Sequence, residues 1–169
     1  MVLERNRRLN RVERKLLRTL RGLDRQYLRI GRRAPKWTRA IKNAVGTLGR
    51  RLRYQVYASQ CKFDRNGEWM LDLAWSRDLG EILTRLPLAM ESEWDPKDIL
   101  WDFTKLVVVR ADVRLMVFWG RTPERAERTV VDMLKQIRRL QGTTVGDRYL
   151  VCCWVEKPPI LEWRSYVVK

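Results

Sequence analysis

The chain has 169 residues, of which 45% are hydrophobic and 33% are charged, and its net charge is +16 at pH 7. Eight tryptophans exclude a wholly disordered chain, since such a composition can bury a core. The absence of any run of about 18 apolar residues excludes a membrane-spanning helix. The chain contains no histidine, which excludes histidine-based catalysis, catalytic triads and histidine-containing zinc sites.

The three cysteines, Cys61, Cys152 and Cys153, do not form a CxxC motif. An odd number of cysteines without such a motif predicts reduced thiols, and we expect these residues to act as small buried hydrophobes. The N-terminus is rich in arginine and has no apolar segment, so we expect no secretory signal. These features together predict a cytoplasmic protein.

The positive charge is concentrated in the first third of the chain. Residues 1–58 contain 18 lysines and arginines and three acids, whereas residues 59–169 contain 18 lysines and arginines and 17 acids. A basic part beside a nearly neutral part indicates a polyanionic partner for the first and a folded core for the second. We therefore predict a basic helical extension over residues 1–35 and an α/β domain over residues 36–169.

The first predicted element is a long helix over about residues 3–31. Apolar side chains recur along it every three or four positions from Leu9 to Ile30, and basic side chains occupy the other faces. The residues expected to bind nucleic-acid phosphates are Arg7, Arg8, Arg11, Arg14, Lys15, Arg18 and Arg21.

Three other roles remain open for this helix. Its apolar stripe can form a coiled-coil homodimer, or pack on the rest of the chain, and its basic face can lie on an anionic membrane surface. Nucleic acid is the favoured partner, because a surplus of fifteen positive charges is more than a solvated surface requires.

The remaining elements follow from alternating and helical patterns of apolar residues. We predict helices over residues 36–53, 96–110 and 123–140, and strands over residues 54–59, 69–75, 87–94, 113–119, 149–155 and 161–168. Residues 78–86 are expected to connect two strands. Asp95 and Thr122 are the predicted N-caps of the second and third of these helices. The order α-β-β-β-α-β-α-β-β predicts an α/β fold with a mixed sheet.

Three acids stand out in the predicted sheet. Strand alternation places Asp72 on one face of its strand, and Glu91 and Glu93 together on one face of the next strand. If the strands pair, the carboxylates converge, and a buried unpaired charge costs several kcal/mol. A hard divalent cation with oxygen ligands would resolve that conflict. The alternative is that this face of the sheet is exposed to solvent.

Asp72, an 18-residue spacer and Glu91-Ser92-Glu93, within an α-β-β-β-α-β order, resemble the PD-(D/E)XK nuclease superfamily. The resemblance covers residues 36–120 and is to the variant with Glu in place of the motif Lys. It implies a restriction-endonuclease-like core, with Asp72 and Glu91 as ligands of Mg²⁺ or Mn²⁺. Glu93 would bind the metal through water or act as general base.

The resemblance also implies two supporting residues. Lys105, on the helix after the third strand, would supply the missing positive charge, and Glu68 would replace an acid that many members carry on the preceding helix. Asp98 and Asp102, on the same helix as Lys105, are expected to be a cap and a surface charge.

The expected function is hydrolysis of phosphodiester bonds, with DNA as the favoured substrate. By family analogy, such an endonuclease would act in defence against foreign DNA or in repair. The alternative is a non-catalytic nucleic-acid-binding or assembly subunit with a degenerate nuclease fold. A third hypothesis for the function is a dimerisation module that uses the apolar stripe of the first helix.

Overall fold

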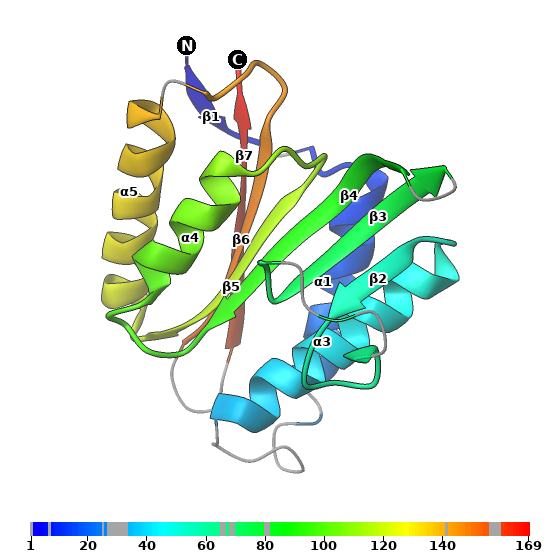
Figure 1. Ribbon diagram of the computed structural model, residues 1–169. Helices are drawn as coiled ribbons and strands as arrows, with labels where there is room; N and C mark the ends of the chain where they lie inside the picture. The colour runs from blue at the N-terminus through cyan, green and yellow to red at the C-terminus, as the bar shows by residue number, and fades with distance from the viewer. Residues whose placement is uncertain are drawn as a thin grey trace.

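The computed structural model describes residues 2–6, 8–24, 26, 34–64, 67, 70–79, 82–140, 142–155 and 160–169. Its elements are β1 (Leu3–Arg5), α1 (Arg11–Asp24), α3 (Ala34–Arg51), β2 (Gln55–Ala58), β3 (Leu73–Leu79), β4 (Ile82–Glu93), α4 (Ile99–Val108), β5 (Arg114–Arg121), α5 (Pro123–Arg139), β6 (Arg148–Val155) and β7 (Ile160–Val168) (Figure 1). From α3 onward, this order is the predicted one.

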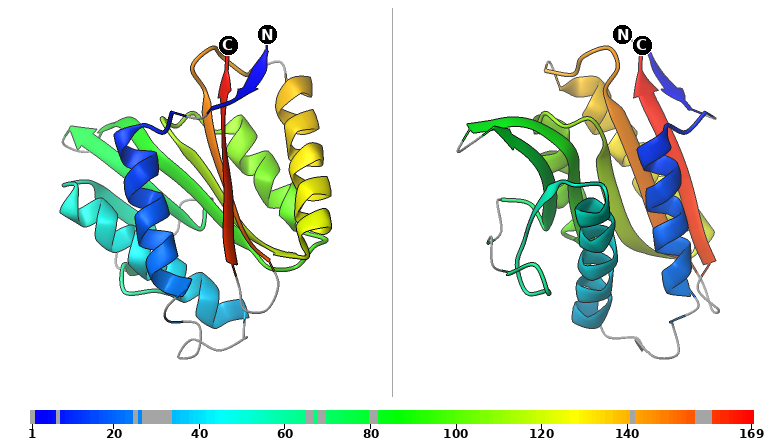
Figure 2. Two further views of the ribbon diagram at one scale, coloured as in Figure 1. Left: turned by 180° about the vertical axis from the view of Figure 1, so that it is seen from behind. Right: turned by 90° about the vertical axis from the view of Figure 1, so that its right-hand side faces the viewer.

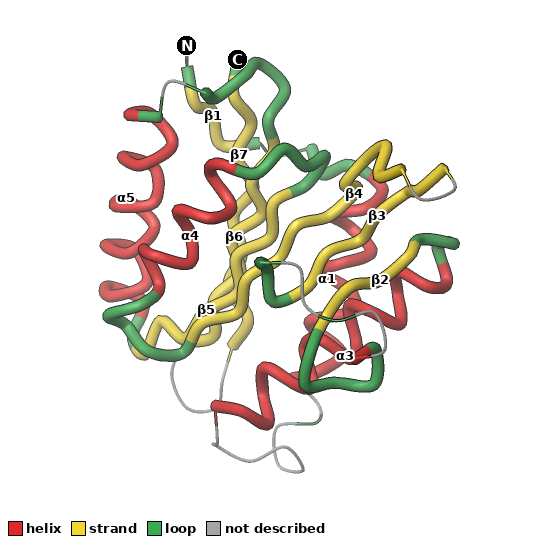
Figure 3. Tube along the Cα trace, viewed as in Figure 1, coloured by secondary structure: helices red, strands yellow, loops and turns green. Residues whose placement is uncertain are grey.

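The strands form one seven-stranded open sheet in the order β1-β7-β6-β5-β4-β3-β2 (Figure 3). Strands β4, β5 and β6 are parallel, and the other neighbours are antiparallel. The predicted α/β class and mixed sheet are therefore confirmed. No helix in the described ranges is both long and apolar enough to cross a membrane.

Helices cover both faces of the sheet (Figure 2). Alternate residues of β4 show why: Leu88 and Met90 belong to the core under α1 and α3, whereas Ala89 belongs to the core under α4 and α5. The result is a three-layer arrangement with two hydrophobic cores. Cys152 and Cys153 are buried as free thiols, one in each core.

The predicted N-terminal helix is wrong at its start, because α1 begins at Arg11 and β1 precedes it. The N–H of Asn10 donates to Oε2 of Glu13 at 2.7 Å, and the N–H of Glu13 donates to Oδ1 of Asn10 at 2.8 Å. This reciprocal pair is a capping box, which sets the first turn of a helix. Residues 3–5 instead pair with β7. The predicted residues 27–31 lie outside the described ranges.

The apolar stripe of α1 is buried within the chain itself. Leu16, Leu20 and Leu23 belong to the same core as α3 and the sheet. Helix α1 thus packs directly against α3, across the predicted boundary at residue 35. A coiled coil through these leucines would have to expose that core. The homodimer remains a prediction, and it would have to form through another surface of the helix.

Two other predicted boundaries differ from the structure. The expected connector at residues 78–86 belongs mostly to the β3–β4 hairpin, whose residues 82–85 are exposed beyond the core and carry no apolar alternation. Helix α4 begins at Ile99 rather than after Asp95, because Asp95 accepts a hydrogen bond from the N–H of Lys97 in a preceding turn. The cap of α5 is as predicted, with Thr122 accepting from the N–H of Arg125.

Candidate active site

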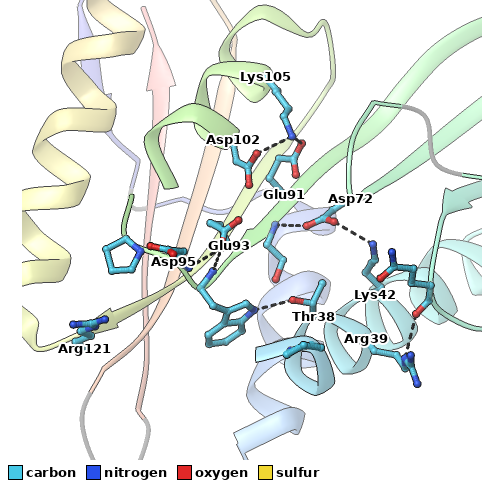
Figure 4. A pocket seen from close by; sticks show the side chains of 15 residues that line it. Thr38, Arg39, Lys42, Asp72, Glu91, Glu93, Asp95, Asp102, Lys105 and Arg121 are labelled. Atoms are coloured by element: carbon cyan, nitrogen blue, oxygen red, sulfur yellow. Dashed lines mark hydrogen bonds and ion pairs between the residues drawn. The ribbon is translucent and has the colours of Figure 1, made fainter. Parts of the chain in front are cut away.

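A pocket of about 610 Å³ opens where β4 and β5 end, between the first half of α3 and helix α4 (Figure 4). It is lined by Pro35, Thr38, Arg39, Lys42, Gln60, Asp72, Glu91, Ser92, Glu93, Trp94, Asp95, Pro96, Asp102, Lys105 and Arg121. The structure therefore brings the predicted Asp72, Glu91, Glu93 and Lys105 into one cavity. Glu68 lies outside the described residues.

The register of two strands places Asp72 beside Glu91. Leu73 pairs with Met90, so Asp72, one residue earlier, lies opposite Glu91. Asp72 is not itself in the strand, since Met70 has a left-handed φ of 48° and β3 begins only at Leu73. Its carboxylate is held by the sheet all the same, because the N–H of Ser92 donates to Oδ2 at 2.8 Å.

Lys42 of α3 is a site residue that the sequence analysis missed. Its Nζ lies 3.1 Å from Oδ1 of Asp72, and its side chain is only 4% exposed (Figure 4). In sequence, Lys42 directly follows Ile41 on the border of the apolar stripe of α3. That position is typical of a lysine whose stem covers the core while its ammonium reaches water. Only the fold shows that the ammonium meets a carboxylate instead.

Glu91 is buried on the side of the sheet that faces α4. Burial, together with the negative charge of Asp72, raises its pKa to about 8. Nζ of Lys105 lies 3.3 Å from its Oε1, as an ion pair. That oxygen nevertheless has no well-directed hydrogen bond among the described residues. Glu91 is thus a buried carboxylate whose charge is balanced by an ion pair with Lys105.

Asp102 was expected on the surface, but it lines the pocket. One turn of α4 separates it from Lys105, whose Nζ lies 2.7 Å from Oδ1 of Asp102. Burial opposes the charge of Lys105, yet the hydrogen bond to Asp102 and the negative charge of Glu91 outweigh it and raise the pKa of Lys105. Asp98 holds the N-cap position of α4 but makes no side-chain cap hydrogen bond.

Glu93 turns partly toward its own backbone. Its Oε1 accepts hydrogen bonds from the N–H of Trp94 at 2.5 Å and of Asp95 at 2.7 Å. Burial raises the pKa of Glu93 and the neighbouring Asp102 adds to that effect, while the two backbone bonds oppose it. Glu93 therefore closes the turn after β4 with one oxygen and faces Asp102 within the pocket.

The acidic side chains of the pocket suit a metal site with two carboxylate ligands, but not one with three. Within the described part of the chain, no three acidic or cysteine side chains are placed to hold one ion. Glu93, expected as an indirect ligand or general base, binds the backbone of the turn with one oxygen. The two expected direct ligands are Asp72 and Glu91. Mg²⁺ is commonly held by one or two carboxylates and completed by water and substrate phosphate.

One wall of the pocket is aromatic. The indole N–H of Trp94 donates to the hydroxyl of Thr38 at 2.9 Å. Behind it, the rings of Trp37 and Trp154 lie 5.9 and 6.1 Å away, centroid to centroid. This packing fixes the end of β4, and with it the backbone that follows Glu91.

Basic side chains occur at the pocket and on α1. Arg39 and Arg121 are exposed at the pocket, on opposite sides of the acids (Figure 4). Among the predicted phosphate-binding residues of the N-terminal segment, those exposed are Arg8, Arg11, Arg14, Arg18 and Arg21, with Lys15 partly exposed. Arg7 lies outside the described residues. The arginines nearest the acids therefore come from α3 and β5, which the sequence analysis did not single out.

Comparisons of the chain with protein-family models, with curated proteins and with solved structures find no match in any of the three. The family resemblance consequently rests on the acidic motif and the order of elements alone.

Proposed function

We propose that the protein is a metal-dependent nuclease whose active site is the pocket between α3 and α4. The observation that carries this proposal is the pair of the partly buried Asp72 and the buried Glu91, side by side at the pocket end of the sheet. Carboxylates are rarely buried unless they pair with cations or bind metal. The order α3-β2-β3-β4-α4-β5 supports a restriction-endonuclease-like core for residues 36–120.

Four residues of the pocket would carry out metal binding, charge stabilisation and proton transfer. Asp72 and Glu91 hold Mg²⁺ or Mn²⁺, which supplies an activated water and neutralises phosphate oxygens. Lys105, beside Glu91, offsets charge that develops on the phosphate. Glu93 is the proton acceptor for the attacking water, and its raised pKa suits that role.

The substrate class follows from charge. A chain with a net charge of +16 and arginines on both sides of its pocket is suited to a polyanion. Arg39 and Arg121 would bind the phosphates that flank the scissile one, and the basic face of α1 would add contacts further away. DNA is the favoured substrate.

One observation favours the second candidate, a non-catalytic nucleic-acid-binding subunit. Asp72 and Glu91 each pair with a lysine, so their charges are compensated without a metal. Under that hypothesis, the side chains of Asp72, Glu91, Lys42 and Lys105 form a structural cluster of ion pairs at the end of the sheet.

A cleavage assay separates the two candidates. We expect the wild-type protein to cut single- or double-stranded DNA with Mg²⁺ or Mn²⁺ and to lose activity in EDTA. Asp72→Asn should abolish cutting, whereas Asp78→Asn, which changes an exposed acid of β3, should not. A wild-type protein that binds DNA or RNA but cuts neither with either metal would support the non-catalytic candidate.

A further inference from the structure

The pocket contains a lysine, Lys42, that has no role in the mechanism proposed above. Lys42 is buried to 96% of its side-chain surface by α3 and the sheet, yet its ammonium points into the cavity toward Asp72 (Figure 4). An ammonium with so little exposure to water is costly unless an anion stays beside it. Whatever takes Asp72 away from Lys42 must therefore bring another anion.

The ion pairs near the acids show which lysine would lose its partner. Lys42 pairs with Asp72, whereas Lys105 pairs with both Glu91 and Asp102. A divalent cation that binds Asp72 and Glu91 therefore takes the acidic partner from Lys42 but leaves Asp102 beside Lys105. One phosphodiester supplies a negative charge at that place, and its neighbours along a strand supply more.

The two lysines are not equivalent in this exchange. Lys105 is one-third exposed and keeps Asp102 at 2.7 Å when Glu91 turns to a cation. Lys42 is buried, and in the described part of the chain its ion pair is with Asp72. Lys42 is thus the cation that a metal would displace from its partner.

We propose that Lys42 binds a phosphate oxygen of the substrate once a divalent cation has taken Asp72 from it, so that the cation and the nucleic acid bind cooperatively. In the free protein, the ammonium of Lys42 occupies the place beside Asp72 and competes with the cation. In the loaded site, the same ammonium contacts the substrate. This inference rests on the proposed function and adds a substrate-binding residue and a linkage to it.

Calorimetric titration with Mn²⁺ tests the proposal without any measurement of turnover. The titration is done with the protein alone and with an oligodeoxynucleotide in which methylene groups replace the leaving oxygens, so that charge is kept and cleavage is blocked. We expect the oligonucleotide to raise the Mn²⁺ affinity of the wild-type protein about tenfold, within the usual range of coupling between sites. An unchanged Mn²⁺ affinity would overturn the proposal without any variant.

Variants of Lys42 should change the Mn²⁺ affinity and the effect of the oligonucleotide in different ways. Lys42→Met removes the competitor, so Mn²⁺ should bind about tenfold more tightly to the protein alone, while the effect of the oligonucleotide should disappear. Lys42→Gln keeps a donor for Asp72 without the charge and should change both quantities in the same directions. The matched control is Lys36→Met, an exposed lysine of the same helix, which should leave both unchanged. Weaker or unchanged Mn²⁺ binding in folded Lys42→Met and Lys42→Gln would show a merely structural ion pair.

Failure of this inference differs from failure of the proposed function. If the wild-type protein cuts DNA in an Asp72-dependent way but Lys42→Met keeps wild-type Mn²⁺ affinity and coupling, the nuclease proposal stands and the role of Lys42 is wrong. If Mn²⁺ and oligonucleotide bind cooperatively through Lys42 but no substrate is cut, the site binds both without catalysis.

Discussion

At Glu91, burial and charge act in opposite directions. The carboxyl is nearly inaccessible and lies near the negative Asp72, and both effects favour its neutral form; Lys105 favours the charged form but does not outweigh them. Metal binding requires the ionised carboxylate. The protonation of Glu91 therefore links the stability of the fold to the occupancy of the site.

The first prediction concerns pH. The folded pKa of Glu91, about 8, lies above its ordinary value of 4.5, so between these values the folded protein holds a proton that the unfolded chain has lost. The contribution of Glu91 to stability is thus complete below pH 4.5 and falls as the pH rises to about 8. Thermal unfolding from pH 5 to pH 8.5 should show a falling Tm, and Glu91→Gln should flatten this fall. Mg²⁺ should raise the wild-type Tm most at pH 8. Equal pH profiles for wild type and Glu91→Gln would contradict the assignment.

The second prediction concerns the two residues placed beside the metal ligands. Glu93→Gln should abolish cleavage and leave DNA binding intact or tighter, since a negative charge near the phosphate is removed. Lys105→Met should lower kcat by about 10² to 10³, the usual effect of losing one electrostatic stabiliser. Lys97→Met changes an exposed lysine in the turn before α4 and is the matched control. Full activity in both Glu93→Gln and Lys105→Met would remove these residues from the reaction.

Among the elements, α3 sets the geometry of the site through its close approach to the sheet. A Cβ added at Gly49 would lie 2.4 Å from Nε1 of the buried Trp75, and one at Gly46 would lie 2.3 Å from the ring of Phe63. Glycine is therefore required for the helix to pack at this depth. The same depth brings Lys42, two turns earlier in α3, to Asp72.

The third prediction compares two helical glycines. Gly49→Ala should lower the free energy of unfolding by about 1 to 3 kcal/mol, because overpacking outweighs the gain in helix propensity. Gly22→Ala in α1 is the control, since nothing lies within 4 Å of its added Cβ, and it should stabilise the protein by up to about 1 kcal/mol. Urea denaturation measures both. If Gly49→Ala were as stable as Gly22→Ala, α3 would not be closely packed.

Apolar alternation and capping motifs in the sequence predicted most helices and strands. The exceptions, β1 and the start of α1, depend on particular hydrogen-bonded partners. The alternation in β4 and the capping motif of α5 predicted those elements and the inward direction of Glu91. Strand β1 has three residues and no apolar pattern, and its pairing with β7 depends on contacts more than 160 positions away. The start of α1 depends on Asn10 and Glu13, whose capping box was overlooked within a longer apolar periodicity.

The sequence named the two strand acids of the candidate site and Lys105, but not Lys42 or Asp102. Asp72 and Glu91 were found because acids in an apolar strand pattern are conspicuous. Lys42 and Asp102 lie on helices, where a charged residue at the border of an apolar stripe is ordinary. Only the packing of α3 and α4 against the ends of the strands turns these side chains toward the acids.

Across the whole molecule, positive charge occurs on two surfaces, one on α1 and one at the pocket. The exposed arginines of α1 lie on the α1–α3 side of the sheet, whereas Arg121 ends β5 at the pocket. The burial of the α1 leucines within the chain leaves its basic face exposed as a surface for polyanions. Binding far from the pocket and binding at the pocket can therefore be separated by mutation.

The fourth prediction tests the role of α1. Replacing Arg11, Lys15, Arg18 and Arg21 by glutamine should weaken DNA binding similarly for all sequences and flatten the dependence of affinity on salt concentration by up to about 3.6 in logarithmic slope. Arg14 is kept because its guanidinium donates to the carbonyl of Leu9 at the start of α1. Fluorescence anisotropy over a series of salt concentrations measures the effect. An unchanged slope would assign the phosphate contacts to Arg39 and Arg121 instead.

The proposed nuclease requires Asp72 and Glu91 to hold a divalent cation together. The most direct measurement is the anomalous electron density of Mn²⁺ in crystals of the protein grown near pH 8, where Glu91 can ionise. We expect a peak within about 2.0 to 2.6 Å of a carboxylate oxygen of each residue, and no peak there in Asp72→Asn crystals. Saturating Mn²⁺ without density between Asp72 and Glu91, while both remain paired with Lys42 and Lys105, would contradict it.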